Sequence, residues 1–248
     1  MNILCQQYGY VESNDQVKRA NIMDSTLQDG RKVSLCLESI SLVCVPIIII
    51  QNTMPTNHIV KVNKIIPIPI SETREGIYKD VKDCALVELE EIIGQPFGIL
   101  WESVKLKEKD LMFVGRQIFL ALKSAHITGY VNENIGDDHN IFVNLTTLHT
   151  TLRGFSANVR KGQELQDAIV YDLLTAAFML WEAITRANGV CKDPTDEDNL
   201  IFQEHALFPS LFKKRTKKYP KYKNLTSILL KIFERKVTSA EKVLELFE

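Results

Sequence analysis

The chain has 248 residues, of which 45% are hydrophobic and 25% charged, so it can bury a sizeable core and is expected to be globular. Its formal net charge of -1 argues against a general nucleic-acid or membrane-surface binder. The positive charges are unevenly distributed, however, and one dense basic run stands near the C-terminal end.

Residues 1–25 are polar and lack periodicity, which predicts a flexible N-terminal extension. No basic region followed by a long apolar run marks a signal peptide there. The 5 cysteines of the chain are far apart and form no C-x-x-C pair, which favours reduced thiols. We therefore expect an intracellular protein, either cytoplasmic or nuclear.

Short apolar runs and alternations predict a strand-rich segment over residues 26–93. The stretch KVSLCLESISLVCVPIIIIQN, starting at Lys32, is rich in β-branched residues and predicts strands. KIIPIPI, from Lys64, predicts a further strand, and its two prolines favour the edge of a sheet. DCALVELEEII predicts another strand, which ends before Gly94.

Helical periodicity dominates residues 94–248. EKDLMFVGRQIFLALKSAH predicts an amphipathic helix, NIFVNLTTLHTTLRG a short hairpin, and DAIVYDLLTAAFMLWEAIT a helix buried on all sides. NLTSILLKIFERKVTSAEKVLELF predicts two amphipathic helices that are divided near Arg235–Thr238, with Thr238 as the N-cap of the second. The fold class is therefore α+β.

This order of elements resembles the protein kinase fold from Gly30 to Phe247. CALVELEEIIGQPFGIL resembles the fifth strand and hinge, and QIFLALKSAHITGYVNENI resembles the long helix that leads into the catalytic loop. DLLTAAFMLWE resembles the central helix of the C-lobe, with Asp172 and Glu182 as structural residues, and Arg235 belongs to the final helix pair. The resemblance implies a two-lobed protein kinase-like fold with a reduced N-lobe (26–93) and a helical C-lobe (94–248).

Phosphoryl transfer needs a lysine on the phosphates, an aspartate that orients the hydroxyl, and ligands for magnesium. On this resemblance Ile48 replaces the lysine, Asn134 replaces the catalytic aspartate, and Gly154 replaces the main metal-binding aspartate. The glycine-rich loop is reduced to Gly30, and the second metal ligand survives only as Asn140, one residue late. The resemblance therefore implies a pseudokinase with no catalytic residues, no metal and no cofactor.

A divergent, active Ser/Thr protein kinase is the first alternative. It would use Asp137, Asp138 or Glu133 as migrated catalytic groups and Lys61 or Lys64 on the phosphates. Two aspartates after a glycine are also typical of an ordinary polar turn. A C-lobe-only binding module is disfavoured, because the strand-rich segment before Gly94 would have no counterpart in it.

The run KKRTKKYPKYK holds seven positive charges in eleven residues: Lys213, Lys214, Arg215, Lys217, Lys218, Lys221 and Lys223. It fits a nuclear-localisation or nucleic-acid patch, on which Tyr219 and Tyr222 would stack with bases. It also fits a docking site for an acidic or phosphorylated partner, or a solvated loop between helices.

The expected role follows from the loss of phosphoryl transfer that the resemblance implies. We expect this domain to bind another protein, such as an active kinase or a kinase substrate, as an allosteric partner, scaffold or decoy in kinase signalling. No membrane partner is expected, and the basic run leaves nucleic acid open as an alternative partner. This function rests on fold-level analogy.

Overall fold

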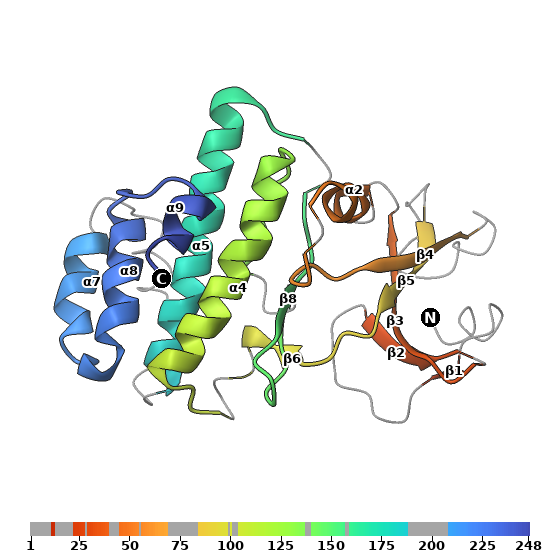
Figure 1. Cartoon of the computed structure of the whole chain (residues 1–248), viewed down its shortest axis with the longest axis horizontal. Helices are drawn as coiled ribbons and strands as arrows, with labels where there is room; N and C mark the ends of the chain where they lie inside the picture. The colour runs from red at the N-terminus through yellow and green to blue at the C-terminus, as the bar shows by residue number, and fades with distance from the viewer. Residues whose placement is uncertain are drawn as a thin grey trace.

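The structure is a computed structural model, and it describes residues 11–12, 22–27, 29–39, 45–54, 56–68, 84–98, 100, 104–136, 140–156, 159–187 and 208–248. A strand-rich part and a helical part lie side by side, with a small sheet and one helix between them (Figure 1). The expected α+β architecture is confirmed.

The strand-rich part is a five-stranded antiparallel sheet. Its order is β1-β2-β3-β5-β4, formed by β1 (Val11–Glu12), β2 (Ile22–Thr26), β3 (Lys32–Ser39), β4 (Val62–Pro67) and β5 (Cys84–Glu90). β5 pairs with both β3 and β4 and is buried along most of its length. The strands predicted at Lys64 and at Asp83 are thus present, and the proline-containing strand lies at the edge as expected.

The first strands begin earlier than the sequence suggests. β1 and most of β2 fall inside residues 1–25, for which we expected a flexible extension. β2 pairs with β3 through the turn at Gly30, where φ is +85°. β2 is thus held by its pairing with β3, and β1 by its pairing with β2, in a segment whose sequence has no regular apolar pattern.

The isoleucine run after β3 is a helix, α2 (Val45–Thr53), where strands were predicted. Pro46 stands in its first turn, where a missing N–H costs nothing. Ile47 and Ile50 are buried in the core shared with the helical part. Burial of this face outweighs the strand preference of isoleucine.

Two long helices form the centre of the helical part. They are α4 (Glu108–Ile127) and α5 (Gly162–Ala187), around which α7 (Phe208–Thr216), the 3₁₀ helix η2 (Pro220–Tyr222), α8 (Lys223–Phe233) and α9 (Ala240–Leu244) pack. From Asp172 to Trp181 every residue of α5 is buried, as predicted for a central helix. By length and hydropathy α5 could cross a membrane, but 67% of its apolar window is buried inside the protein, as in the core helix of a globular domain.

The C-terminal helix pair forms as predicted, with one local difference. α8 ends at Phe233 and α9 starts at Ala240, on either side of the predicted division. The N-cap of α9 is Ser239, whose hydroxyl accepts a hydrogen bond from the Lys242 amide, and not the predicted Thr238. The two hydroxyl residues are adjacent, and sequence alone does not separate them.

A small sheet joins the two parts. It consists of β6 (Gln95–Pro96), β7 (Ile141–Val143) and β8 (Thr150–Leu152), and β7 and β8 are the predicted hairpin. The chain enters it from β5 through Gly94, where φ is +141° and an added Cβ would lie 2.6 Å from the Val143 carbonyl. Only glycine fits this close approach.

A second connection runs from the α2–β4 segment to β8. Ile59 forms a parallel bridge with Leu152. The Leu152 amide donates to the His58 carbonyl (2.8 Å), and the Val60 amide donates to the Leu152 carbonyl (3.1 Å). Within the described residues, backbone connections thus join the strand-rich part to the small sheet at both Gly94 and Leu152.

Candidate functional site

Asp172 on α5 holds the loop that follows α4. Its side chain is fully buried and accepts hydrogen bonds from the backbone amides of Asn132 and Glu133, both at 2.8 Å. Nε2 of His126 lies 2.9 Å from the same carboxylate and must donate, since a carboxylate only accepts. The predicted counterpart of the catalytic loop is therefore fixed from beneath by one buried carboxylate.

Asn134 belongs to a network of amides. Its backbone amide donates to Oδ1 of Asn132 (3.2 Å), and its backbone carbonyl accepts from Nδ2 of Asn140 (2.9 Å). The network closes on Arg153, whose carbonyl accepts from Asn132 Nδ2 and whose amide donates to the Asn140 carbonyl. A neutral amide supplies neither the negative charge nor the proton acceptor that a catalytic aspartate supplies.

Gly154, which follows this network, adopts a φ of +80°. An added Cβ there would lie 2.7 Å from Cγ, Nδ2 and Oδ1 of Asn140. The buried Asn140 side chain therefore fills the space that an aspartate at position 154 would need. The two positions expected to supply metal ligands exclude each other in this conformation.

Glu133 forms an ion pair that the sequence did not predict. Nη2 of Arg160 lies 3.0 Å from Oε1 and 3.4 Å from Oε2 of Glu133, and both side chains are about one-third exposed. The backbone of this segment is also fixed, since the Arg160 amide donates to the Gly129 carbonyl (3.0 Å). Arg160 stands 27 residues from Glu133, and no sequence spacing indicated the pair.

The position expected for the lysine needs correction. Ile48 lies on α2, where it is half-buried, and not on a strand. The third strand of the sheet is β3, whose one lysine, Lys32, is its exposed first residue. α2 has no acidic residue, and its Gln51 Nε2 donates to the Val60 carbonyl (3.4 Å). Active kinases pair a lysine of this strand with a glutamate of the following helix. Here β3 has no lysine after its first residue, and α2 has no glutamate.

The residues of the active-kinase alternative are not brought together by the described part of the chain. Asp137, Asp138 and His139 lie outside the described residues. Lys61 and Lys64 are exposed, on or beside the edge strand β4. Among the described residues, no group of three or more His, Cys, Asp or Glu could hold a metal ion.

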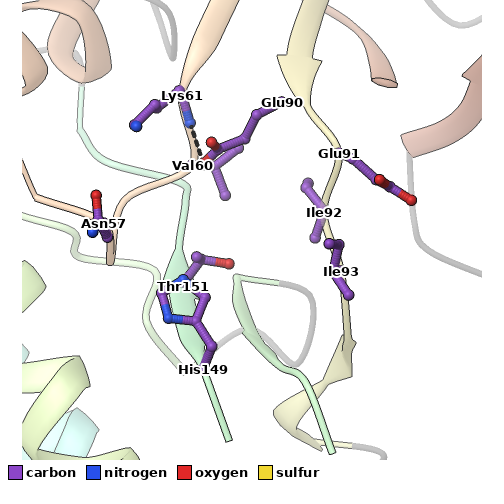
Figure 2. A pocket seen from close by; sticks show the side chains of 9 residues that line it. All are labelled: Asn57, Val60, Lys61, Glu90, Glu91, Ile92, Ile93, His149 and Thr151. Atoms are coloured by element: carbon purple, nitrogen blue, oxygen red, sulfur yellow. Dashed lines mark hydrogen bonds between the residues drawn. The ribbon is translucent and has the colours of Figure 1, made fainter. Parts of the chain in front are cut away.

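A pocket of about 280 Å³ lies where the two parts of the protein meet (Figure 2). It is formed by three segments that are distant in sequence, and its lining residues are Asn57, Val60, Lys61, Glu90, Glu91, Ile92, Ile93, His149 and Thr151. Oε1 of Glu90 accepts a hydrogen bond from the Lys61 amide (3.0 Å) along its wall. None of the asparagines of the amide network contributes to this lining.

A histidine pair contributes to this pocket, since His149 is one of its lining residues and His58 packs against His149. Nδ1 of His58 lies 3.0 Å from the Thr150 carbonyl, and the rings of His58 and His149 are 5.3 Å apart. The pKa of His58 is lowered, mainly by burial, and the nearby His149 and Arg116 lower it further against the opposing effect of the Thr150 carbonyl. His58 is therefore held in its neutral form more strongly than an exposed histidine.

The basic run consists mostly of helix and turn. It is not the loop between helices that one of our alternatives described. Lys213, Lys214 and Arg215 end α7, and Lys223 begins α8. Tyr219 and Tyr222 are buried, so they are not available to stack on bases. The suggestion that they form a stacking platform is therefore wrong, because these rings belong to the core.

Two further residues were expected to have structural roles, Glu182 and Arg235. Glu182 is half-buried on α5, and Arg235 is exposed in the turn after α8 with a φ of +54°. Their structural roles stay predictions.

Searches by sequence find no matching family model and no matching curated protein. The structure itself matches 1864 solved chains, so its arrangement of elements is a common one. One of them is described as "Crystal structure of Rad53 1-466 in complex with AMP-PNP", with a TM-score of 0.59 and 12% sequence identity. The match covers 95% of this chain and 64% of that chain, so this chain spans less than two thirds of its length. At this identity the likeness concerns the fold, and the chain has a protein kinase-like fold.

Proposed function

We propose that this chain is a catalytically inactive protein kinase-like domain, a pseudokinase, that acts by binding another protein. It would serve as an allosteric partner, scaffold or decoy, and its partner would be an active kinase or a kinase substrate. The observation that supports this most strongly is the mutual exclusion of Asn140 and a side chain at position 154.

Three further features support the loss of catalysis. Asn134 offers a neutral amide at the position of the base. The β3 strand has no lysine beyond its first residue, and α2 has no glutamate to pair with one. Phosphoryl transfer depends almost entirely on positioned charge, so the combined absence of these groups is more damaging than any single loss.

The divergent-kinase alternative has less support. Glu133 is the only one of its proposed acids among the described residues, and Arg160 faces both of its carboxylate oxygens. The nucleic-acid alternative is also weakened, because the aromatic residues of the basic run are buried.

The test is the melting temperature of the purified protein with ATP, measured with and without magnesium. A ligand present at a hundred times its dissociation constant stabilises the folded state by about 2.7 kcal/mol, which is an easily measured shift. We expect no magnesium-dependent shift and no transfer of radiolabelled phosphate to protein substrates or to the chain itself. A shift that requires magnesium, together with phosphate transfer, would overturn the proposal.

A further inference from the structure

The positive charges of the basic run are displayed on one ordered part of the surface. The side chain of Lys213 is 59% exposed, and Lys214, Lys217, Lys218 and Lys221 are also exposed. We define the basic surface as Lys213, Lys214, Arg215, Lys217, Lys218, Lys221 and Lys223. It extends over the end of α7, η2 and the start of α8, at one end of the helical part (Figure 1).

Buried aromatic rings support this surface from beneath. Trp181 of α5 makes edge contacts with Phe212 and Tyr219, at centroid distances of 4.8 and 5.3 Å, and Phe212 in turn contacts Phe233 at 4.9 Å. The backbone that carries the cations is therefore held in place before any partner arrives. A surface ordered in advance loses less conformational entropy on binding.

A neighbouring segment adds more positive charge. The hydroxyl of Tyr222 donates to the Leu106 carbonyl (2.9 Å), and Leu106 is flanked by the exposed Lys105 and Lys107. Glu108 accepts hydrogen bonds from the backbone amides of Asn224 and Leu225, so this acid is used to hold the start of α8. Positive charge thus extends from η2 to the segment before α4.

Glu234 is an acidic residue that contacts this surface. Glu234 lies 2.8 Å from Lys213 and also pairs with Lys236, and these contacts lower its pKa. The chain as a whole has a net charge of -1, so the rest of it is acidic and the cations are concentrated here. Such a concentration steers an oppositely charged partner to one place on the molecule.

We propose that the basic surface is the docking site for an Asp/Glu-rich segment of a partner protein; this inference rests on the proposed function as a binding domain. Six of the seven cations are lysines, which act as separate point charges. A segment with carboxylates spread along it matches charges spread over helix, turn and helix. A single phosphate would instead need converging arginine donors, and Arg215 is the one arginine here.

Other anionic partners fit the surface less well. Single-stranded nucleic acid binds where aromatic rings are exposed beside cations, whereas Tyr219 and Tyr222 are buried. A membrane surface is engaged most firmly when apolar side chains insert beside the basic ones. Among the described residues, none of the large exposed hydrophobic side chains lies between Lys213 and Lys223.

The experiment measures fluorescence anisotropy of labelled peptides with the full chain. The probe is a twelve-residue peptide with six glutamates, and the glutamine version of it is the neutral control. We expect binding of the glutamate peptide alone, with an affinity that falls as salt is added. No binding to the wild-type chain would overturn the proposal.

Two charge-reversed variants locate the site. The first replaces Lys217, Lys218 and Lys221 by glutamate, and the control replaces Lys161, Lys231 and Lys242, which are also exposed. Both change the net charge equally and avoid the paired Lys213, and their melting temperatures verify folding. We expect about tenfold weaker binding for the first variant and a small change for the control, as about 0.5 kcal/mol per surface ion pair implies. Equal weakening in both would overturn the proposal.

Two competing ligands test which class of molecule binds the basic surface. A peptide with the same total charge, carried mainly by one cluster of phosphoserines, and a single-stranded RNA of that charge are titrated alongside. Tighter binding of either would assign the surface to that class and overturn the proposal. Phosphate transfer from ATP would refute the proposed function without affecting peptide binding, so the two failures are distinguishable.

Discussion

Asn140 and Gly154 compete for one space: a Cβ added to Gly154 would lie 2.7 Å from three side-chain atoms of Asn140. The Asn140 amide is committed elsewhere, because its Nδ2 donates to the Asn134 carbonyl. Positions 140 and 154 are therefore linked. A side chain placed at position 154 would displace the Asn140 side chain and disturb its hydrogen bond to Asn134.

Gly154→Ala should destabilise the protein more than Gly30→Ala. The two glycines have nearly the same φ, +80° and +85°, but nothing lies within 4 Å of a Cβ at Gly30. Both variants should therefore lose about 1 kcal/mol or more to backbone strain, and Gly154→Ala should lose about 1–3 kcal/mol in addition from overpacking. Urea denaturation measures the difference.

The cause of that extra loss can be isolated in the background of Asn140→Gly. There the contact is absent, and Gly154→Ala should cost about as much as Gly30→Ala. Equal costs in the wild-type background would show that Asn140 moves aside freely, which contradicts the argument from mutual exclusion.

Asp172→Asn should be strongly destabilising. The variant keeps the shape of the side chain but replaces one acceptor oxygen by a donor, which would face an amide N–H or the His126 ring. Leaving a buried donor unsatisfied costs about 1–3 kcal/mol, so we expect a loss of at least about 2 kcal/mol in the free energy of unfolding. Asp167→Asn, at an exposed site on the same helix, is the matched control and should change it little.

The Glu133–Arg160 ion pair should couple the loop after α4 to the segment after Gly154. Both side chains are partly exposed, so the coupling free energy in a double-mutant cycle should be modest, about 0.5–1 kcal/mol. The charge-swapped double variant Glu133→Arg with Arg160→Glu should be more stable than either single variant. Purely additive effects in urea denaturation would rule out the coupling.

His58 should make stability depend on pH. Because burial lowers its pKa in the folded state, the unfolded chain binds the proton more readily. The contribution of the neutral ring is complete above the unfolded pKa of about 6.5, and it is lost as the pH falls from there through the lower folded pKa. As the pH falls through this range, the melting temperature of the wild type should therefore decrease relative to that of His58→Gln. A difference that is independent of pH would contradict the assignment.

The helical part could be predicted because its signals are local. Apolar residues at three- and four-residue spacings define α4 and α8, and the largely apolar sequence of α5 predicted its central place. The hairpin of β7 and β8 is local in the same sense. These elements need only their own sequence and a core to pack against.

The strand-rich part was predicted less well because its signals depend on distant partners. The run from Val45 to Ile50 is β-branched and favours a strand, yet burial of Ile47 and Ile50 against residues from the rest of the core makes it a helix. The lysine position was consequently placed at Ile48, on the wrong element. β1 and β2 lie in a segment without apolar periodicity, and their strand structure depends on pairing, of β2 with β3 and of β1 with β2.

The candidate site shows the same contrast between local signals and contacts with distant residues. The sequence indicated Asn134, Gly154 and Asp172 by their order in the chain, but it did not indicate how they interact. Arg160 and the lining of the pocket come from segments far apart in sequence, and no spacing rule joins them. Contacts between distant residues are what the fold adds.

The two attachments between the strand-rich and helical parts limit how these parts can move. One is the covalent passage through Gly94, and the other is the set of backbone hydrogen bonds that joins His58 and Val60 to Leu152. Sliding of one part against the other would break these hydrogen bonds, and it would also expose Ile47 and Ile50, which are buried in the core shared with the helical part. A partner that bound both parts would therefore meet two surfaces whose relative position is already restrained, and it would lose less conformational entropy on binding.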